Sequence, residues 1–129
     1  MCSVVTTGTP IYCPFEATAY YKQATTSIGG QRKLTSYGNY IDLRCDNGYR
    51  IILAHLSRFE GAATPITATA KQSGSTYTYS RGTREVSAGN ILGYVGTTGN
   101  SSGPHLHIEV YNPSGVRVDP ATVFPSLTR

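Results

Sequence analysis

The sequence Gly103-Pro104-His105-Leu106-His107-Ile108-Glu109-Val110 sets two imidazoles two residues apart, in a segment with the alternating pattern of a β-strand. Side chains at positions i and i+2 of a strand leave the same face, so His105 and His107 are expected to face one cleft, about 7 Å apart from Cα to Cα. Leu106 and Ile108 are expected to point the other way, into a core. An isolated His-x-His pair is weak evidence for a metal, and a half-buried surface pair is an equally good interpretation.

Two neighbouring features favour a functional site. The turn-rich run 96–104 leads into this strand, and its Gly and Asn residues permit the positive φ angles that a close approach requires. The remaining histidine, His55, lies in a second apolar, strand-like segment, Leu53-Ala54-His55-Leu56-Ser57. Functional residues often lie on or beside such loops. The three histidines of the chain are therefore predicted to contribute to one site.

The composition predicts one mostly β domain. The chain has 14 Gly and 10 Tyr among 129 residues, and only 14% of its residues are charged, which is typical of short strands joined by turns. A chain of this length buries about two-thirds of its unfolded surface in one core. No segment predicts a helix longer than two turns, although 56–60 is expected to form one short helical turn. Residues 1–129 are interpreted as a single domain.

The strongest hairpin signal lies in the first half of the chain. The segment Tyr40–Cys45 alternates apolar and polar residues, Asp46-Asn47-Gly48 predicts a turn, and Tyr49–His55 returns as a second strand. Upstream of it, the polar stretch 22–36 has Gly29-Gly30 near its centre. This stretch is expected to be a loop or the tip of a hairpin.

A second polar region follows the first hairpin. The segment 64–84 is rich in Thr, Ser, Tyr and Gly without helical periodicity, so it predicts a hairpin or a mobile loop. Its Tyr77 and Tyr79 alternate with threonine and are candidates for lining a substrate groove. An exposed β-edge is the simpler interpretation of the same pattern.

The charge balance limits the expected partners. A formal net charge of +4 favours an anionic partner, and the anionic polymers of a bacterial envelope fit as well as nucleic acid does. Because no stretch combines clustered Lys and Arg with a nucleic-acid motif, no nucleic-acid partner is expected. No apolar run is long enough to span a membrane, so no membrane insertion is expected. The N-terminus lacks the basic and apolar regions of a secretory signal.

The three cysteines, Cys2, Cys13 and Cys45, form no Cys-x-x-Cys pair. Cys13 and Cys45 lie in apolar, strand-like settings and are expected to be small core residues. One disulfide remains open as an alternative, so the cysteines do not settle the redox compartment.

The order of five motifs resembles that of the lysostaphin-type, or LytM-type, zinc metallopeptidases that cut peptide cross-bridges in peptidoglycan. The resemblance implies the duplicated hybrid motif, an antiparallel, mostly β sandwich or barrel with little or no helix. It also marks the region at about 62–84 as a variable loop or hairpin insertion, because 71–84 is longer than this family usually carries. The matching segments are Gly8–Tyr12, Tyr37–Tyr49, Ala54–Ser57, Val86–Gly99 and Gly103–Val110, followed by a closing Val118-Asp119-Pro120.

The resemblance also implies roles for the three histidines. Carried over by position, His107 is a zinc ligand, while His55 and His105 orient and deprotonate the attacking water and stabilise the oxyanion. A zinc ion with three protein ligands keeps one position open, lowers the pKa of its bound water towards about 7 and polarises the scissile carbonyl. Histidine suits these proton transfers because its pKa lies near neutrality.

The chain departs from the family pattern at its start. The family takes its other two zinc ligands from a His-x-x-x-Asp motif just before the strand that matches Pro10-Ile11-Tyr12, and residues 1–129 contain no such motif. Counting back places the Asp position near Cys2 and the His position before Met1. Cys2 is an alternative zinc ligand as a thiolate, and a terminal residue without a metal role is the simpler interpretation. Either the chain begins inside a longer reading frame, or it is a degenerate relative that kept the fold and lost the zinc.

Two functions follow from the resemblance. The first is a zinc-dependent endopeptidase that cleaves peptidoglycan cross-bridges, with peptidoglycan peptide or another envelope polymer as its partner. The alternative is a catalytically inactive module without a metal, which binds virion or envelope proteins in a phage tail or baseplate or in a cell-envelope complex. In both cases the chain is expected to act outside the cytoplasm, as a phage virion component or as a fragment of a larger exported protein. A third option fits the motifs less well, namely phosphorylation of His105 or His107 as in sugar-phosphotransferase carrier domains.

Overall fold

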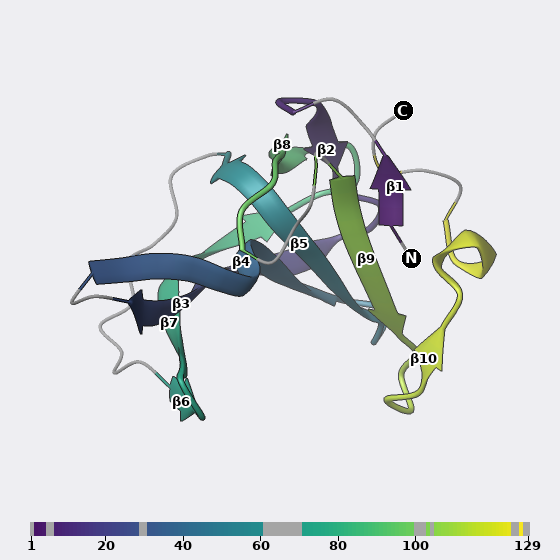
Figure 1. Ribbon diagram of the computed structural model, residues 1–129. Coiled ribbons are helices and arrows are strands. Elements are labelled where there is room, and N and C mark those ends of the chain that lie inside the picture. The colour runs from purple at the N-terminus through teal and green to yellow at the C-terminus, as the bar shows by residue number, and fades with distance from the viewer. Residues whose placement is uncertain are drawn as a thin grey trace.

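The fold is built almost entirely from antiparallel β-strands (Figure 1). The computed structural model describes residues 2–4, 7–28, 31–60, 71–99, 103, 105–124 and 127. In these ranges the only helix is the 3₁₀ turn η1, and no helix is long and apolar enough to cross a membrane. The elements are β1 (Cys2–Val4), β2 (Pro10–Tyr12), β3 (Ala17–Ile28), β4 (Gln31–Cys45), β5 (Arg50–Phe59), β6 (Lys71–Ser73), β7 (Thr76–Val86), β8 (Ile91–Val95), β9 (His105–Tyr111), β10 (Arg117–Val118) and η1 (Pro120–Thr122).

The strands form one sheet in the order β1-β9-β5-β4-β3-β7-β6. Strand β10 pairs with β9, and β8 pairs with both β2 and β5. Among the described strands no pairing joins β6 to β1, so the sheet is open and does not close into a barrel. The predicted mostly β, antiparallel fold is confirmed.

Alternation along β9 separates a core face from a polar face. Leu106 and Ile108 are buried in the main hydrophobic cluster, as predicted, together with Leu53 of β5. His107 and Glu109 occupy the intervening positions and therefore face the opposite side of the sheet. The strand that carries the histidines is thus fixed by the burial of its other side chains.

The chain forms longer strands than its composition indicated. The polar stretch 22–36, expected to be a loop or hairpin tip, belongs largely to β3 and β4, which pair as far as Ile28 and Gln31. The expected tip at Gly29-Gly30 lies outside the described residues. Polar strands of this kind are recognised by their pairing and not by apolar alternation, which is why the sequence pattern did not reveal them.

The expected helical turn at 56–60 is wrong. Leu56, Arg58 and Phe59 belong to β5 and pair with β8. The tertiary pairing with β8 overrides the weak local preference of this short segment. The prediction for Cys13 and Cys45 is confirmed, since both are buried and free of disulfide bonds.

The segment expected to be an insertion contributes two strands to the sheet. Strand β7 pairs with β3 over nine residues of β3, from Ala17 to Thr25, and β6 adds a short outer strand. The side chain of Arg84 in β7 donates to the carbonyls of Glu60 and Ile91, at 2.8 and 3.1 Å. These bonds connect β7 to the residue that follows β5 and to the first residue of β8. Residues 61–70 lie outside the described residues.

Candidate functional site

His55 and His107 come together from the neighbouring strands β5 and β9. Their ring centroids are 6.1 Å apart, with an interplanar angle of 58°. In the ladder between the two strands, Ala54 is the direct partner of His107. We call this pair of rings the histidine centre.

An irregularity in β5 brings His55 to this face. In the pairing with β4, Leu56 lies opposite Asn39 and Leu53 opposite Ile41, so two residues of β5 oppose one residue of β4. With regular alternation His55 would share the core face of Leu53, but the extra residue re-aims it, as β-bulges do. His55 has a left-handed φ of 65°, which is unusual for a residue other than glycine.

Hydrogen bonds hold the bulge and fix the orientation of the His55 ring. The His55 Nδ1 atom lies 2.7 Å from the carbonyl oxygen of Thr98. Because a carbonyl only accepts, Nδ1 carries the proton in this bond, and Nε2 of the neutral ring carries the lone pair. The Thr98 hydroxyl donates to the Leu56 carbonyl at 2.7 Å, and the buried Asn39 amide donates to the same carbonyl at 3.1 Å. The ring is thereby presented with Nε2 as a proton acceptor.

Two glycines allow the Thr98 loop to approach β4 closely. Gly38 and Gly99 have φ angles of 62° and 75°. A Cβ atom on Gly38 would lie 2.5 Å from the Thr98 carbonyl carbon, and a Cβ atom on Gly99 would lie 2.5 Å from the Gly38 nitrogen. Only glycine fits at these two positions, and the acceptor of the His55 proton depends on this backbone contact.

A buried carboxylate holds the second histidine. Nε2 of His107 lies 2.8 Å from Oε2 of Glu109, which also accepts a hydrogen bond from the Tyr37 hydroxyl at 2.6 Å. The Tyr111 hydroxyl donates to Oε1 at 2.7 Å. The Tyr37 ring stacks on the His107 ring, with centroids 6.1 Å apart and an interplanar angle of 23°. His107 is thus fixed on one side by a carboxylate and on another by an aromatic ring.

The same contacts determine the protonation state of Glu109. Burial alone would raise the pKa of Glu109, but hydrogen bonds from Tyr37, Tyr111 and His107 and the charge of Arg117 outweigh burial and lower its pKa to about 2. Burial and the bond to Glu109 raise the pKa of Tyr37. Glu109 is therefore a carboxylate near neutral pH and accepts hydrogen bonds from the His107 ring and both tyrosines.

Sequence patterns did not identify Tyr37, Thr98 and Glu109 as residues that support the histidine centre. Glu109 had a usable signal, because it lies two residues after His107 and so faces the same side of β9. Tyr37 and Thr98 reach the centre from segments distant in sequence, and their contacts with it depend on the tertiary fold.

The other predicted site residues are placed by the backbone alone or lie apart from the centre. His105 lies in β9 opposite Val4, and Cys2 lies in β1 opposite His107. The positions of these two side chains lie outside the described part of the chain. Tyr77 and Tyr79 lie on β7, from which β3 and β4 separate β5 and its histidine. Tyr77 is not on an edge, because it pairs with both β3 and β6.

The described side chains do not complete a zinc site. Catalytic zinc takes three protein ligands, usually from His, Glu, Asp or Cys. Over the described ranges, no group of three or more such side chains is placed to hold a metal ion. The part of the chain that the structure describes therefore supplies histidines for such a site without a full ligand set.

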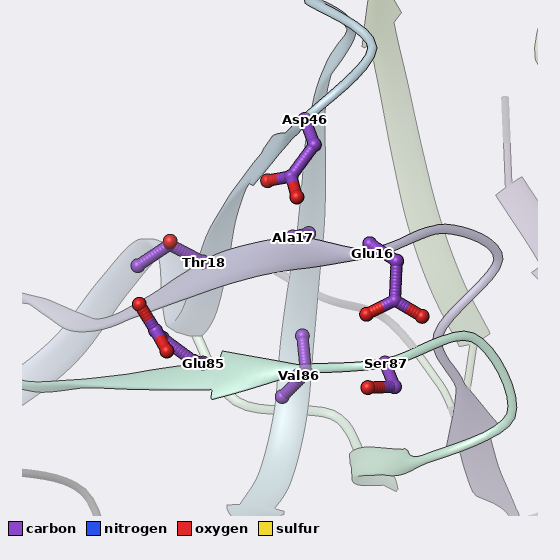
Figure 2. Close-up of a pocket in the computed structure, with 7 residues that line it drawn as sticks. All are labelled: Glu16, Ala17, Thr18, Asp46, Glu85, Val86 and Ser87. Carbon is purple, nitrogen blue, oxygen red and sulfur yellow. The ribbon is translucent and has the colours of Figure 1, made fainter.

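A separate polar pocket of about 370 Å³ lies at one end of β3 and β7 (Figure 2). Carboxylates of Glu16, Asp46 and Glu85 surround it, and Ala17, Thr18, Val86 and Ser87 complete its lining. None of these residues belongs to the histidine centre. The pocket marks a negatively charged region on the domain surface.

Replacing Glu109 with glutamine is expected to loosen His107, because the neutral amide is a weaker hydrogen-bond acceptor than the carboxylate. In wild-type protein, ¹⁵N NMR of the imidazole is expected to show the proton of neutral His107 on Nε2. The E109Q spectrum is expected to show a mixture of tautomers. Tyr111→Phe is the control, because it removes a bond to the other carboxylate oxygen. An unchanged His107 tautomer in E109Q would contradict the role of Glu109.

Comparison with known proteins identifies the family. The sequence model of Peptidase family M23 matches residues 3–120. DD-carboxypeptidase/endopeptidase Mpg of Neisseria meningitidis serogroup B is 34% identical over 96 residues, which are 72% of this chain but only 17% of Mpg.

Two solved structures share the fold. The catalytic domain of the antimicrobial peptidase lysostaphin from Staphylococcus simulans superposes with a TM-score of 0.56 and 23% identity, over 94% of this chain and 74% of that domain. The catalytic domain of the prophage-encoded M23 protein EnpA from Enterococcus faecalis superposes with a TM-score of 0.58 and 22% identity, over 95% and 75%. The match over residues 3–120 shows that this chain belongs to peptidase family M23, as the order of its motifs predicted.

Proposed function

We propose that this chain is a peptidoglycan-directed M23 peptidase domain whose histidine centre contacts the scissile peptide. The observation that carries the proposal is the convergence of His55 and His107, whose rings lie 6.1 Å apart and are each held by a hydrogen bond. The family match supports peptide-bond hydrolysis as the reaction. The names of the relatives, a DD-carboxypeptidase/endopeptidase and an antimicrobial peptidase, support cell-wall peptide as the substrate.

The histidines have complementary roles in this proposal. The Nε2 atom of His55 accepts a proton from the attacking water or, once protonated, donates a hydrogen bond to the oxyanion. Glu109 and Tyr37 hold His107 at the same face, so its ring has a defined position before substrate arrives. We propose that His105 belongs to the same group, because it lies two residues before His107 in β9. Residues 1–129 act as one domain at the cell wall, outside the cytoplasm.

Hydrolysis through zinc requires ligands beyond those that the described residues provide. Strand β1 places the backbone of Cys2 opposite His107, and Cys2 lies near the position that the family pattern gives to the Asp of its His-x-x-x-Asp motif. We propose that zinc binds at His107 only when a His-x-x-x-Asp motif supplied at this end of β1 completes the ligand set.

The test compares three proteins for bound zinc and for release of soluble peptides from purified peptidoglycan. They are the 129-residue chain, the chain with an N-terminal segment that carries His-x-x-x-Asp, and the extended chain with His107→Ala. The extended chain is expected to bind about one equivalent of zinc and to release peptides, whereas the other two proteins bind less than about a tenth of an equivalent. An extended chain that binds zinc and releases no peptide would contradict the proposed function.

A second candidate is a catalytically silent binding module in a phage tail or a cell-envelope complex. It is favoured by one observation, the absence of a three-ligand group among the described side chains. This candidate predicts that the 129-residue chain binds soluble muropeptide equally well with zinc and with a chelator, and that no peptide is cleaved. Cleavage by the 129-residue chain would exclude it.

A further inference from the structure

Three arginines lie in one row across the polar face of the sheet. In the strand ladders Arg44 of β4 pairs with Arg50 of β5, Arg50 pairs with Tyr111 of β9, and Tyr111 pairs with Arg117 of β10. Cross-strand partners share a face, so the three guanidinium groups project from the same side. Tyr111, Glu109 and His107 alternate along β9, which places this row on the face of the histidine centre. We call Arg44, Arg50 and Arg117 the arginine row.

The row carries more positive charge than its surroundings neutralise. The fully buried Asp42 accepts hydrogen bonds from Arg50 at 2.9 Å and from Arg44 at 3.1 Å, and Lys22 lies 3.6 Å from the same carboxylate. Three cations therefore share the Asp42 carboxylate. Arg117, the third member of the row, lies 4.0 Å from the Glu109 carboxylate, so four cations on this face lie beside two carboxylates among the described residues. Like charges directly opposite one another destabilise a sheet, and Arg44 and Arg50 are such a pair. The excess charge favours an anionic ligand.

The guanidinium groups are both accessible and held in place. The side chains of Arg44 and Arg50 are 57% and 45% exposed. Arg44 lies over the Tyr20 ring at 5.5 Å and Arg50 over the Tyr111 ring at 5.6 Å. Each guanidinium has five N–H donors, and the bonds to Asp42 use only some of them. A cation fixed by a carboxylate and an aromatic ring loses little conformational entropy when it binds a ligand.

We propose that the arginine row binds a carboxylate of the peptide ligand, at a distance from the peptide bond that meets the histidine centre. This inference rests on the proposed function, since it takes a cell-wall peptide as the ligand. Arginine suits a carboxylate because its planar fork forms two parallel hydrogen bonds. Thr18 of β3 pairs with Arg44 on one side and with Glu85 of β7 on the other. Glu85 thus adds negative charge at the β7 end of the arginine row, beside the acidic pocket. The carboxylate of the peptide is therefore expected to bind between β4 and β10.

The spacing along β9 sets the register of the ligand. Tyr111 lies four residues beyond His107, which is about 14 Å along a strand. An extended peptide covers this length with about four residues. The row thus selects a peptide with a free carboxylate about four residues from the bond at the histidine centre.

The experiment measures binding of two soluble muropeptides by calorimetry, one with free carboxylates and one with the same carboxylates amidated. Wild-type protein is expected to bind the free acid about tenfold more tightly, and high salt is expected to reduce this preference. The test variant is Asp42→Asn with Arg44→Gln and Arg50→Gln, which removes the buried carboxylate together with its two arginines. It is expected to bind both peptides as weakly as wild-type protein binds the amidated one.

The matched control is Arg58→Gln. Arg58 also lies over a tyrosine, at 3.8 Å from the Tyr94 ring centroid, its side chain is 65% exposed, and its loss changes the net charge by the same single unit as the triple variant. The control is expected to keep the tenfold preference. If the triple variant does not fold, Arg117→Gln replaces it and is expected to reduce the preference several-fold.

The outcomes separate the arginine row from the proposed function. Equal binding of the two peptides by wild-type protein would contradict carboxylate binding by the arginine row and leave the proposed function standing. A preference for the free acid that survives in the triple variant would do the same. Competition by inorganic phosphate as effective as that by the free-acid peptide would overturn the assignment to a peptide carboxylate. If neither peptide binds, the proposed function is contradicted, and so is carboxylate binding by the arginine row.

Discussion

Replacing Gly99 with alanine is expected to destabilise the domain by about 2–5 kcal/mol and to abolish any activity that depends on His55. The new Cβ atom would collide with the Ser36 carbonyl oxygen and with the Gly38 nitrogen, which are backbone atoms and cannot rotate away. The φ of 75° adds a further cost for a residue with a side chain. Any shift of this loop displaces the Thr98 carbonyl, which accepts the His55 proton.

Gly74→Ala measures the cost of a positive φ without a collision between the new Cβ atom and the backbone. Gly74 has a similar φ of 59°, but a Cβ atom there meets nothing within 4 Å. Its replacement is expected to cost only about 1–2 kcal/mol and to leave the histidine centre unchanged. Urea denaturation of both variants measures the difference in free energy of unfolding. Equal losses in the two variants would show that the contact between Gly38 and Gly99 does not constrain the loop.

The second large effect is expected at Asp42. Replacing Arg44 and Arg50 with glutamine leaves the buried carboxylate of Asp42 with Lys22 as its one cationic partner among the described residues, and we expect a loss of about 3–5 kcal/mol. Adding Asp42→Asn removes the uncompensated charge and is expected to recover much of this loss. Urea midpoints at pH 7 measure both effects. A triple variant no more stable than the double variant would contradict the charge argument.

The Asp42 carboxylate also makes the stability of the domain sensitive to acid. Burial would raise the pKa of Asp42, but hydrogen bonds from Arg50 and Arg44 outweigh burial and lower its pKa below the ordinary value. The ionised form is therefore the one that the fold stabilises. This contribution is fully present above the unfolded pKa of about 3.9 and is lost as the pH falls through the folded pKa. Asp42→Asn is expected to lose less stability than wild-type protein between pH 5 and pH 3.

Much of the fold was predictable from short patterns. The turn at Asp46-Asn47-Gly48 correctly indicated the hairpin of β4 and β5, and the alternation in Gly103–Val110 correctly indicated β9. The long polar parts of β3 and β4 were not predicted, because their threonines, lysines and glutamines form strands only when paired with a partner. The strand at 56–59 was missed for the same reason, since its pairing with β8 is a long-range contact.

The candidate site was predictable in its histidines but not in their supports. The two-residue spacing placed His107 on a polar face. His55 was assigned to the same site from its apolar, strand-like segment, and the family resemblance then implied its role. Its convergence with His107 depends on a bulge, which shifts every later side chain by one position and leaves no periodic signal. Tyr37 and Thr98 were missed because a contact between a strand and a loop that are distant in sequence has no local signature.

The pairing of β7 with β3 also affects how the domain behaves towards its own copies. Without β7, the ladder positions from Ala17 to Thr25 would present unpaired backbone N–H and C=O groups at the edge of a long strand. Such an edge is a template for association with another chain. Strand β7 therefore covers this edge of β3, and a shortened protein without β7 is expected to aggregate even when its histidine centre is intact.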